Sequence, residues 1–106
     1  MYTSLVLIVD YNDRNRKLAR DGLRSAGFPT IEAATAAEGI ARASADLPDL
    51  ILMDLRLPDL DGTEAIRVLK SEPRTERIPV VAMTALRLDA NEAWLVGAGF
   101  AGSIAK

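Results

Sequence analysis

The sequence predicts an α/β protein whose parallel β-sheet is covered by helices on both faces. Short apolar runs of strand length alternate with stretches of helical periodicity, and these runs are apolar at successive positions. A strand that is buried on one face only would alternate apolar and polar side chains, whereas the strands of parallel sheets are buried on both faces. Strict alternation of strands and helices is typical of crossover connections between parallel strands.

The pattern accounts for five strands and four helices in one domain, residues 1–106, without repeats, linkers or low-complexity segments. We expect the strands at residues 5–9, 30–34, 50–53, 78–83 and 100–104. A doubly wound sheet of five strands normally has a fifth helix after its last strand, but the sequence stops at Lys106. We therefore expect a domain that is truncated before the fifth helix.

The first strand ends at Asp10, and a helix follows. Asn12 or Asp13 can cap this helix, because a short side chain there can accept a bond from an N–H of the first turn. Its apolar positions follow helical spacing: Leu18, Ala19, Leu23 and Ala26. Gly27 ends the helix. Gly22 lies in its interior, where glycine costs roughly 1 kcal/mol relative to alanine.

The second and third helices have local signals at their ends. Thr35 and Glu38 form a capping box at the start of an alanine-rich helix that extends to about Asp46. The third helix, residues 63–72, ends before Pro73. Its inward positions are expected to be Ala65, Ile66 and Leu69.

The fourth strand begins near Pro79, where a missing N–H removes no bond from the interior of a sheet. Asp89 and Glu92 are expected to cap a fourth helix, which carries Ala93, Leu95 and Val96 and ends at Gly97. The fifth strand is short and leads to the end of the sequence.

Composition excludes several classes of protein. Apolar residues make up 49% of the chain, which is enough for a core, and 26% of residues are charged. The net charge is −2 without a basic stripe, so nucleic acid is not an expected partner. There is no cysteine or histidine, which excludes disulfides, thiolate ligands and imidazole chemistry. The apolar runs fall well short of the ~20 residues that span a bilayer, and no signal peptide is visible. We expect a cytoplasmic domain with no membrane contact.

Polar side chains follow the strands at one edge of the predicted sheet. Asp10 follows the first strand, Asp54 the third and Thr84 the fourth, and Lys106 closes the fifth. Because the carboxyl ends of parallel strands share one edge, these four residues can converge on a single site. A carboxylate can act as the nucleophile that forms an acyl phosphate, while a cation and a hydroxyl offset the charge of the phosphoryl oxygens. The pattern therefore favours phosphoryl transfer.

Four stretches of the sequence form a recognisable set: VDYNDRNRKL at residues 9–18, DLRLPDLDG at 54–62, VVAMTA at 80–85 and IAK at 104–106. Through them the sequence resembles bacterial two-component response-regulator receiver domains of the CheY-like, single-domain type. The resemblance covers the whole chain up to Lys106. It implies a flavodoxin-like sheet with the strand order 2-1-3-4-5.

The resemblance also implies a role for each site residue. Asp54 would accept a phosphoryl group from a phospho-histidine of a histidine kinase or phosphotransfer protein, and Thr84 and Lys106 would bind that group. Asp10, Asp54 and the backbone carbonyl of Arg56 would hold Mg²⁺. Such a domain signals to a downstream protein target and is not a dedicated enzyme.

The sequence departs from the family pattern at four places. Tyr11 stands where a second acid usually ligates the metal, and a phenol is a poor ligand for a hard cation. We therefore expect Mg²⁺ to bind more weakly. Ser103 replaces a switch aromatic, Gly22 replaces a large apolar residue, and no fifth helix is present.

Two other functions compete with the phosphoacceptor. Tyr11 and Ser103 favour a pseudo-receiver, a protein-binding module with weak or no phosphorylation. A phosphatase with an aspartyl nucleophile would need an Asp-x-Asp pair after the first strand, which Asp10-Tyr11-Asn12 does not provide. Asp59 and Asp61 are interpreted as turn and helix-cap residues.

The expected truncation leaves one face of the sheet without its second helix. We expect apolar side chains of the first and last strands to be exposed there, which would favour a homo-oligomer through this face. Trp94 and Val96 could extend the apolar surface.

Overall fold

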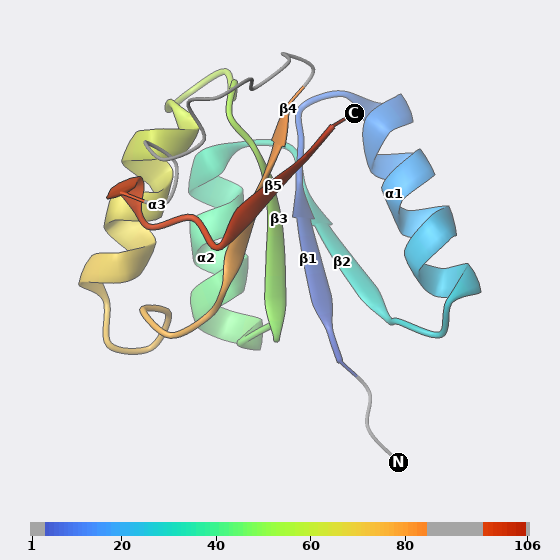
Figure 1. Cartoon of the computed structure of the whole chain (residues 1–106), viewed down its shortest axis with the longest axis horizontal. Helices are drawn as coiled ribbons and strands as arrows, with labels where there is room; N and C mark the ends of the chain where they lie inside the picture. Colours follow the sequence, from blue (N-terminus) through green and yellow to red (C-terminus); the bar gives the residue numbers. More distant parts are fainter. Residues whose placement is uncertain (1–3, 85–96, 106) are drawn as a thin grey trace.

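The structure is a computed structural model that describes residues 4–84 and 97–105. All pairs of neighbouring strands are parallel, and the strand order is β2-β1-β3-β4-β5 (Figure 1). The elements are β1 (Val6–Val9), α1 (Asp13–Ser25), β2 (Thr30–Ala33), α2 (Ala36–Asp46), β3 (Leu50–Asp54), α3 (Gly62–Ser71), β4 (Val80–Thr84) and β5 (Gly102–Ala105). The predicted fold class and strand order are confirmed.

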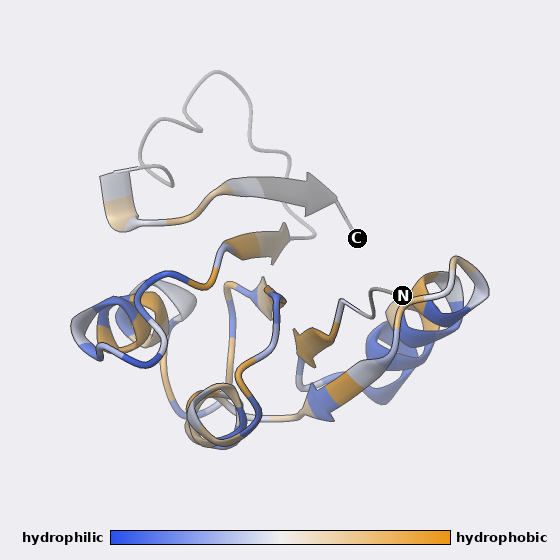
Figure 2. Ribbon diagram, turned by 90° about the horizontal axis from the view of Figure 1, so that it is seen from below, coloured by the Kyte–Doolittle hydropathy of each residue, from blue (hydrophilic) through white to orange (hydrophobic). Residues whose placement is uncertain are grey.

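The helices cover both faces of the sheet, with α1 on one face and α2 and α3 on the other (Figure 2). Alternate residues of each central strand point to opposite faces, so β1 supplies both cores. The larger core lies beneath α2 and α3 and includes Leu7, Val9, Ile51, Met53, Val80, Ile66 and Leu69. The smaller core lies beneath α1 and consists of Val6, Ile8, Leu52 and Met83, with Ala19 and Leu23 packed against it.

The predicted cap of α1 is confirmed, and so is the Thr35 half of the capping box predicted for α2. The Asn12 side chain accepts a bond from the Asn15 N–H at 3.1 Å, and Thr35 Oγ1 accepts one from the Glu38 N–H at 3.1 Å. Gly27, with φ of 95°, occupies a left-handed conformation that favours glycine just beyond α1. Short polar side chains and glycine therefore define these helix ends, as the sequence indicates.

The predicted apolar face of α1 is only partly correct. Ala19 and Leu23 face the sheet, but the Leu18 side chain is 66% exposed and Ala26 is exposed as well. Successive helical residues are rotated by about 100°, so Leu18 cannot share the stripe that Ala19 and Leu23 occupy. Polar residues of α1, among them Arg16, also face inward.

The end of the chain differs from prediction in detail. Phe100 is buried ahead of β5 rather than inside it, because β5 begins at Gly102. The predicted fourth helix falls mainly on residues 85–96, so its bounds, together with Trp94 and Val96, lie outside the described residues.

The open apolar face expected beside α1 is not seen in the described side chains. Val6, Ile8, Leu52 and Met83 are all buried, and Leu50 and Val81 are partly buried. These side chains cover one another and pack against Ala19 and Leu23 of α1. Self-association through this face stays a prediction, which the burial of these side chains does not favour.

Two helical glycines provide a test of the packing. A Cβ at Gly22 would meet no atom within 4 Å, whereas a Cβ at Gly39 would lie 2.8 Å from Val9 Cγ2. Gly22→Ala should raise the free energy of unfolding by about 1 kcal/mol, because alanine favours helix. Gly39→Ala should lower it by about 0–2 kcal/mol, because the cost of shifting the core at Val9 offsets the same helix gain and can exceed it. Urea unfolding monitored by circular dichroism measures both, and equal effects would contradict this packing.

Candidate functional site

The site lies at the edge of the sheet where the parallel strands end. Val9 of β1 pairs with Met53 of β3, so the residues that follow them, Asp10 and Asp54, lie side by side on neighbouring strands. Both are buried, with exposed fractions of 1% and 7%. Adjacent strands are about 4.8 Å apart. The fold therefore brings two of the predicted site residues together as a pair of buried carboxylates.

Asp10 is fixed where β1 leaves the sheet. Its backbone N–H donates to the Ala33 carbonyl of β2 at 3.0 Å, and its Oδ1 accepts a bond from the Asn12 N–H at 2.9 Å. The second bond forms a turn that leads directly into the cap of α1. Tyr11 lies within this turn, and its side chain is 64% exposed.

Asp54 ends β3 and is held in a similar way. Its Oδ1 accepts a bond from the Arg56 N–H at 3.1 Å, while the next residue, Leu55, donates from its N–H to the Met83 carbonyl of β4 at 3.3 Å. Arg56 is exposed, and its backbone pairs with Asp61 across the turn. The carbonyl of Arg56 thus belongs to a turn with defined backbone bonds.

Glycine is required where this turn enters α3. The Gly62 N–H donates to the Leu55 carbonyl at 2.9 Å. A Cβ at Gly62 would lie 2.8 Å from Leu55 Cα and 2.9 Å from the Asp54 carbonyl oxygen, both of which are backbone atoms. Any side chain there would displace the turn that follows Asp54.

Asp59 ties the same turn to α2. Its two carboxylate oxygens accept bonds from the Ala36 and Ala37 N–H groups, each at 2.9 Å. These backbone bonds hold the pKa of Asp59 below its usual value, because they stabilise the charged form. Asp59, which the sequence analysis grouped with Asp61 as turn and helix-cap residues, lies in this turn and also caps α2. Asp61 occupies the N-cap position of α3 and makes no side-chain cap bond.

Sequence reasoning missed Arg16. Its Nη1 donates to the carbonyl oxygens of Asp10 at 2.6 Å and Tyr11 at 3.2 Å, and its Nη2 bonds to Asp13. The sequence offered one signal that Arg16 faces the sheet: it lies three residues before Ala19, on the same stripe of α1. The pattern did not show that the guanidinium would reach back to the loop after β1.

The other predicted residues are only partly placed. The backbone of Thr84 ends β4 and pairs with Ala105 of β5, which brings this strand end to the same edge. The side chain of Thr84 and the whole of Lys106 lie outside the described residues. The side chain of Ser103 does too.

The described donors suit magnesium better than a softer metal. Within residues 4–84 and 97–105, no group of three or more acidic, histidine or cysteine side chains could hold an ion. Asp10 and Asp54 provide two carboxylates, and Arg56 provides a carbonyl in the adjoining turn. Mg²⁺ usually keeps several waters and needs only one or two carboxylates from the protein, so this donor set fits it.

None of the helices in the described ranges combines the length and apolar character that crossing a bilayer requires.

Comparison with known proteins shows the family. The family model described as the response regulator receiver domain matches residues 6–106. The polar-differentiation response regulator DivK of Brucella ovis is 39% identical over 90 residues, which cover 85% of this chain and 73% of DivK.

Solved structures show the same fold. The receiver domain of sensor histidine kinase PA1611 from Pseudomonas aeruginosa PAO1 is 31% identical with a TM-score of 0.87, and the match covers 99% of this chain and 86% of that one. That structure holds a magnesium ion in its active-site cleft. The chemotaxis response regulator CheY4 of Vibrio cholerae, at 23% identity, has a TM-score of 0.91 over 99% of this chain and 88% of its own. The chain belongs to the response-regulator receiver domain family and is a CheY-like signalling domain of two-component systems.

Proposed function

We propose that this domain accepts a phosphoryl group on Asp54 from a phospho-histidine of a histidine kinase or phosphotransfer protein, and then acts on a downstream protein in the cytoplasm. The observation that carries the proposal is the position of Asp54, which is buried at the end of β3 beside Asp10. Its carboxylate is oriented by the Arg56 N–H at 3.1 Å. The domain takes part in its own phosphorylation and is not a dedicated enzyme.

In the proposed transfer, Asp54 is the nucleophile. A carboxylate oxygen of Asp54 forms the new P–O bond as the P–N bond to the donor imidazole breaks, and the electron pair of that bond stays on the imidazole nitrogen. Thr84 is proposed to donate its hydroxyl to a phosphoryl oxygen, and Lys106 is proposed to pair with the phosphate. Both roles come from the family resemblance.

Asp10, Asp54 and the Arg56 carbonyl are proposed to hold Mg²⁺. When bound, the ion offsets the negative charge of the phosphoryl oxygens. The exposed Tyr11 stands where the family usually has a second acid, so we propose that this chain binds Mg²⁺ more weakly than its relatives.

The same observation on Tyr11 supports a second candidate, a pseudo-receiver that binds partner proteins with little or no phosphorylation. In that case the fold and the carboxylate pair persist, but the site takes up a phosphoryl group too slowly to signal. The two candidates differ in whether acetyl phosphate labels the unmodified domain in the presence of Mg²⁺.

Asp54→Asn should abolish labelling by acetyl phosphate, because an amide is a far weaker nucleophile than a carboxylate. The matched control is Asp61→Asn, which changes an exposed carboxylate of the same turn that makes no cap bond. The acyl phosphate can be trapped and located by peptide mass spectrometry. Labelling of Asp54→Asn equal to that of the unmodified domain would refute the assignment, whereas absence of label from the unmodified domain would favour the pseudo-receiver.

Tyr11→Asp should tighten Mg²⁺ binding by about tenfold or more, because a charge ~4 Å from the ion contributes several kcal/mol at the effective permittivity of a protein surface. Without Mg²⁺ the same variant should be less stable, since three carboxylates then repel one another. Isothermal titration calorimetry measures the affinity, and Tyr11→Asn controls for loss of the phenol. Equal affinities for Tyr11→Asp and Tyr11→Asn would show that this position does not reach the ion.

A further inference from the structure

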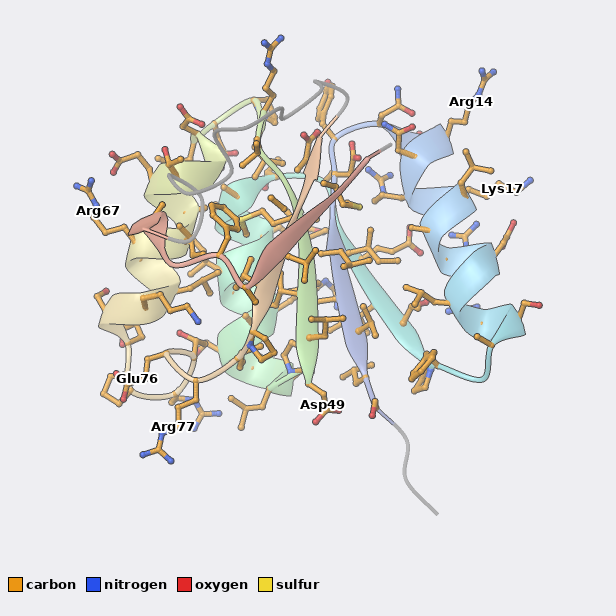
Figure 3. The ribbon with its side chains drawn as sticks, in the orientation of Figure 1. Arg14, Lys17, Asp49, Arg67, Glu76 and Arg77 are labelled. Atoms are coloured by element: carbon orange, nitrogen blue, oxygen red, sulfur yellow. The ribbon has the colours of Figure 1, made fainter. Side chains whose placement is uncertain are left out.

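Arg16 differs from the other basic residues near the start of α1. Arg14 and Lys17 are exposed and point away from the sheet (Figure 3). The Arg16 side chain is only 16% exposed. It lies against the loop after β1, where Nη1 donates to the carbonyl oxygens of Asp10 at 2.6 Å and Tyr11 at 3.2 Å. Arg16 is thus bound to two successive peptide groups of the loop that presents Asp10.

The charge of Arg16 is balanced by its neighbours. Its guanidinium pairs with Asp13 and lies 3.4 Å from Glu32 Oε1 of β2, while Arg20 pairs with Glu32 Oε2 at 2.9 Å. Arg20 also lies 3.7 Å from Asp21 Oδ1, so two guanidinium groups face three carboxylates. Because the positive charge of Arg16 is already compensated by Asp13 and Glu32, we expect its influence on the carboxylate pair to act mainly through the geometry of the loop.

The loop needs such a contact at this point. The last sheet bond of β1 is the one from the Asp10 N–H to the Ala33 carbonyl at 3.0 Å. From there, the Asp10 carboxylate is oriented by the bond from the Asn12 N–H, whose position depends on the backbone angles of residues 10 and 11. The bonds from Arg16 hold the carbonyls of Asp10 and Tyr11 in place. The Asn12 N–H belongs to the same peptide group as the Tyr11 carbonyl, so its bond to Asp10 Oδ1 depends on where Arg16 holds that group.

We propose that Arg16 is a positioning residue of the acid pocket: it holds the loop backbone so that Asp10 faces Asp54, and it thereby strengthens the binding of Mg²⁺. The part that concerns Mg²⁺ rests on the function proposed above. The part that concerns the loop rests on the contacts of Arg16 alone.

The experiment compares Arg16→Gln with Arg20→Gln. Each variant removes one positive charge from α1 and one partner of Glu32, but only the first removes the bonds to the loop carbonyls. The loss of a positive charge would by itself leave Mg²⁺ binding unchanged or slightly tighter. Arg16→Gln should instead weaken it by about tenfold, as expected when a group that orients a metal ligand is lost, whereas Arg20→Gln should not weaken it.

Amide hydrogen exchange at Asn12, measured by NMR without metal, provides the second readout. The exchange rate should rise by about tenfold in Arg16→Gln and stay unchanged in Arg20→Gln, because the Asn12 N–H bonds to Asp10 Oδ1. Arg16→Lys, which keeps a donor, should recover part of both effects. This variant also keeps the test informative if Arg16→Gln does not fold.

Equal Asn12 exchange in the two glutamine variants would overturn the proposal, whatever the metal affinity. If Asn12 exchanges faster in Arg16→Gln than in Arg20→Gln but the two variants bind Mg²⁺ equally well, the claim that Arg16 strengthens Mg²⁺ binding is overturned. If the unmodified domain binds no Mg²⁺, the proposed metal site fails, but exchange at Asn12 still decides whether Arg16 positions the loop.

Discussion

The site depends on the register between β1 and β3. Val9 opposite Met53 places Asp10 opposite Asp54, and a shift of one residue along either strand would separate the two carboxylates. The register is specified by packing, because a slip of one residue would exchange side chains between the two cores: Leu7, Val9, Ile51 and Met53 face the larger core, and Ile8 and Leu52 face the smaller one. Hydrophobic packing of the sheet therefore determines where the like charges meet. Two charged carboxylates on adjacent strands would repel each other, which is one reason why we propose that a cation binds between them.

The turns beyond the strands hold the carboxylates in place. The turn after Asp54 is constrained at Gly62 by backbone contact and at Asp59 by two bonds to the start of α2. The turn after Asp10 is constrained by the Asn12 N–H and by Arg16. Apart from Arg16, the two carboxylates are thus held by backbone bonds and short side chains, so little conformational entropy is left to be lost when a ligand binds.

The sequence was sufficient for features that have local causes. Alternating apolar runs located the strands and helices, and the caps at Asn12 and Thr35 follow from side chains within three residues of their partners. The convergence of Asp10 and Asp54 was predictable because parallel topology directs all strand ends to one edge.

Features that depend on contacts between distant elements were not predictable. Asp59 caps a helix that begins 23 residues earlier in the chain. Leu18 is exposed because Ala19 and Leu23 form the stripe of α1 that faces β1 and β2. The bonds from Arg16 to the carbonyls of Asp10 and Tyr11 cannot be predicted from the spacing of apolar residues in α1.

The central claim is that Asp10 and Asp54 form one cation site. The most direct test is a double-mutant cycle in which Mg²⁺ affinity is measured by calorimetry for Asp10→Asn, Asp54→Asn and the double variant. A shared site predicts that each single substitution weakens binding strongly and that the second adds little, which gives a coupling energy well above the ~0.5 kcal/mol of independent positions. Losses that add within that limit, or a single variant that binds as tightly as the unmodified domain, would contradict the account.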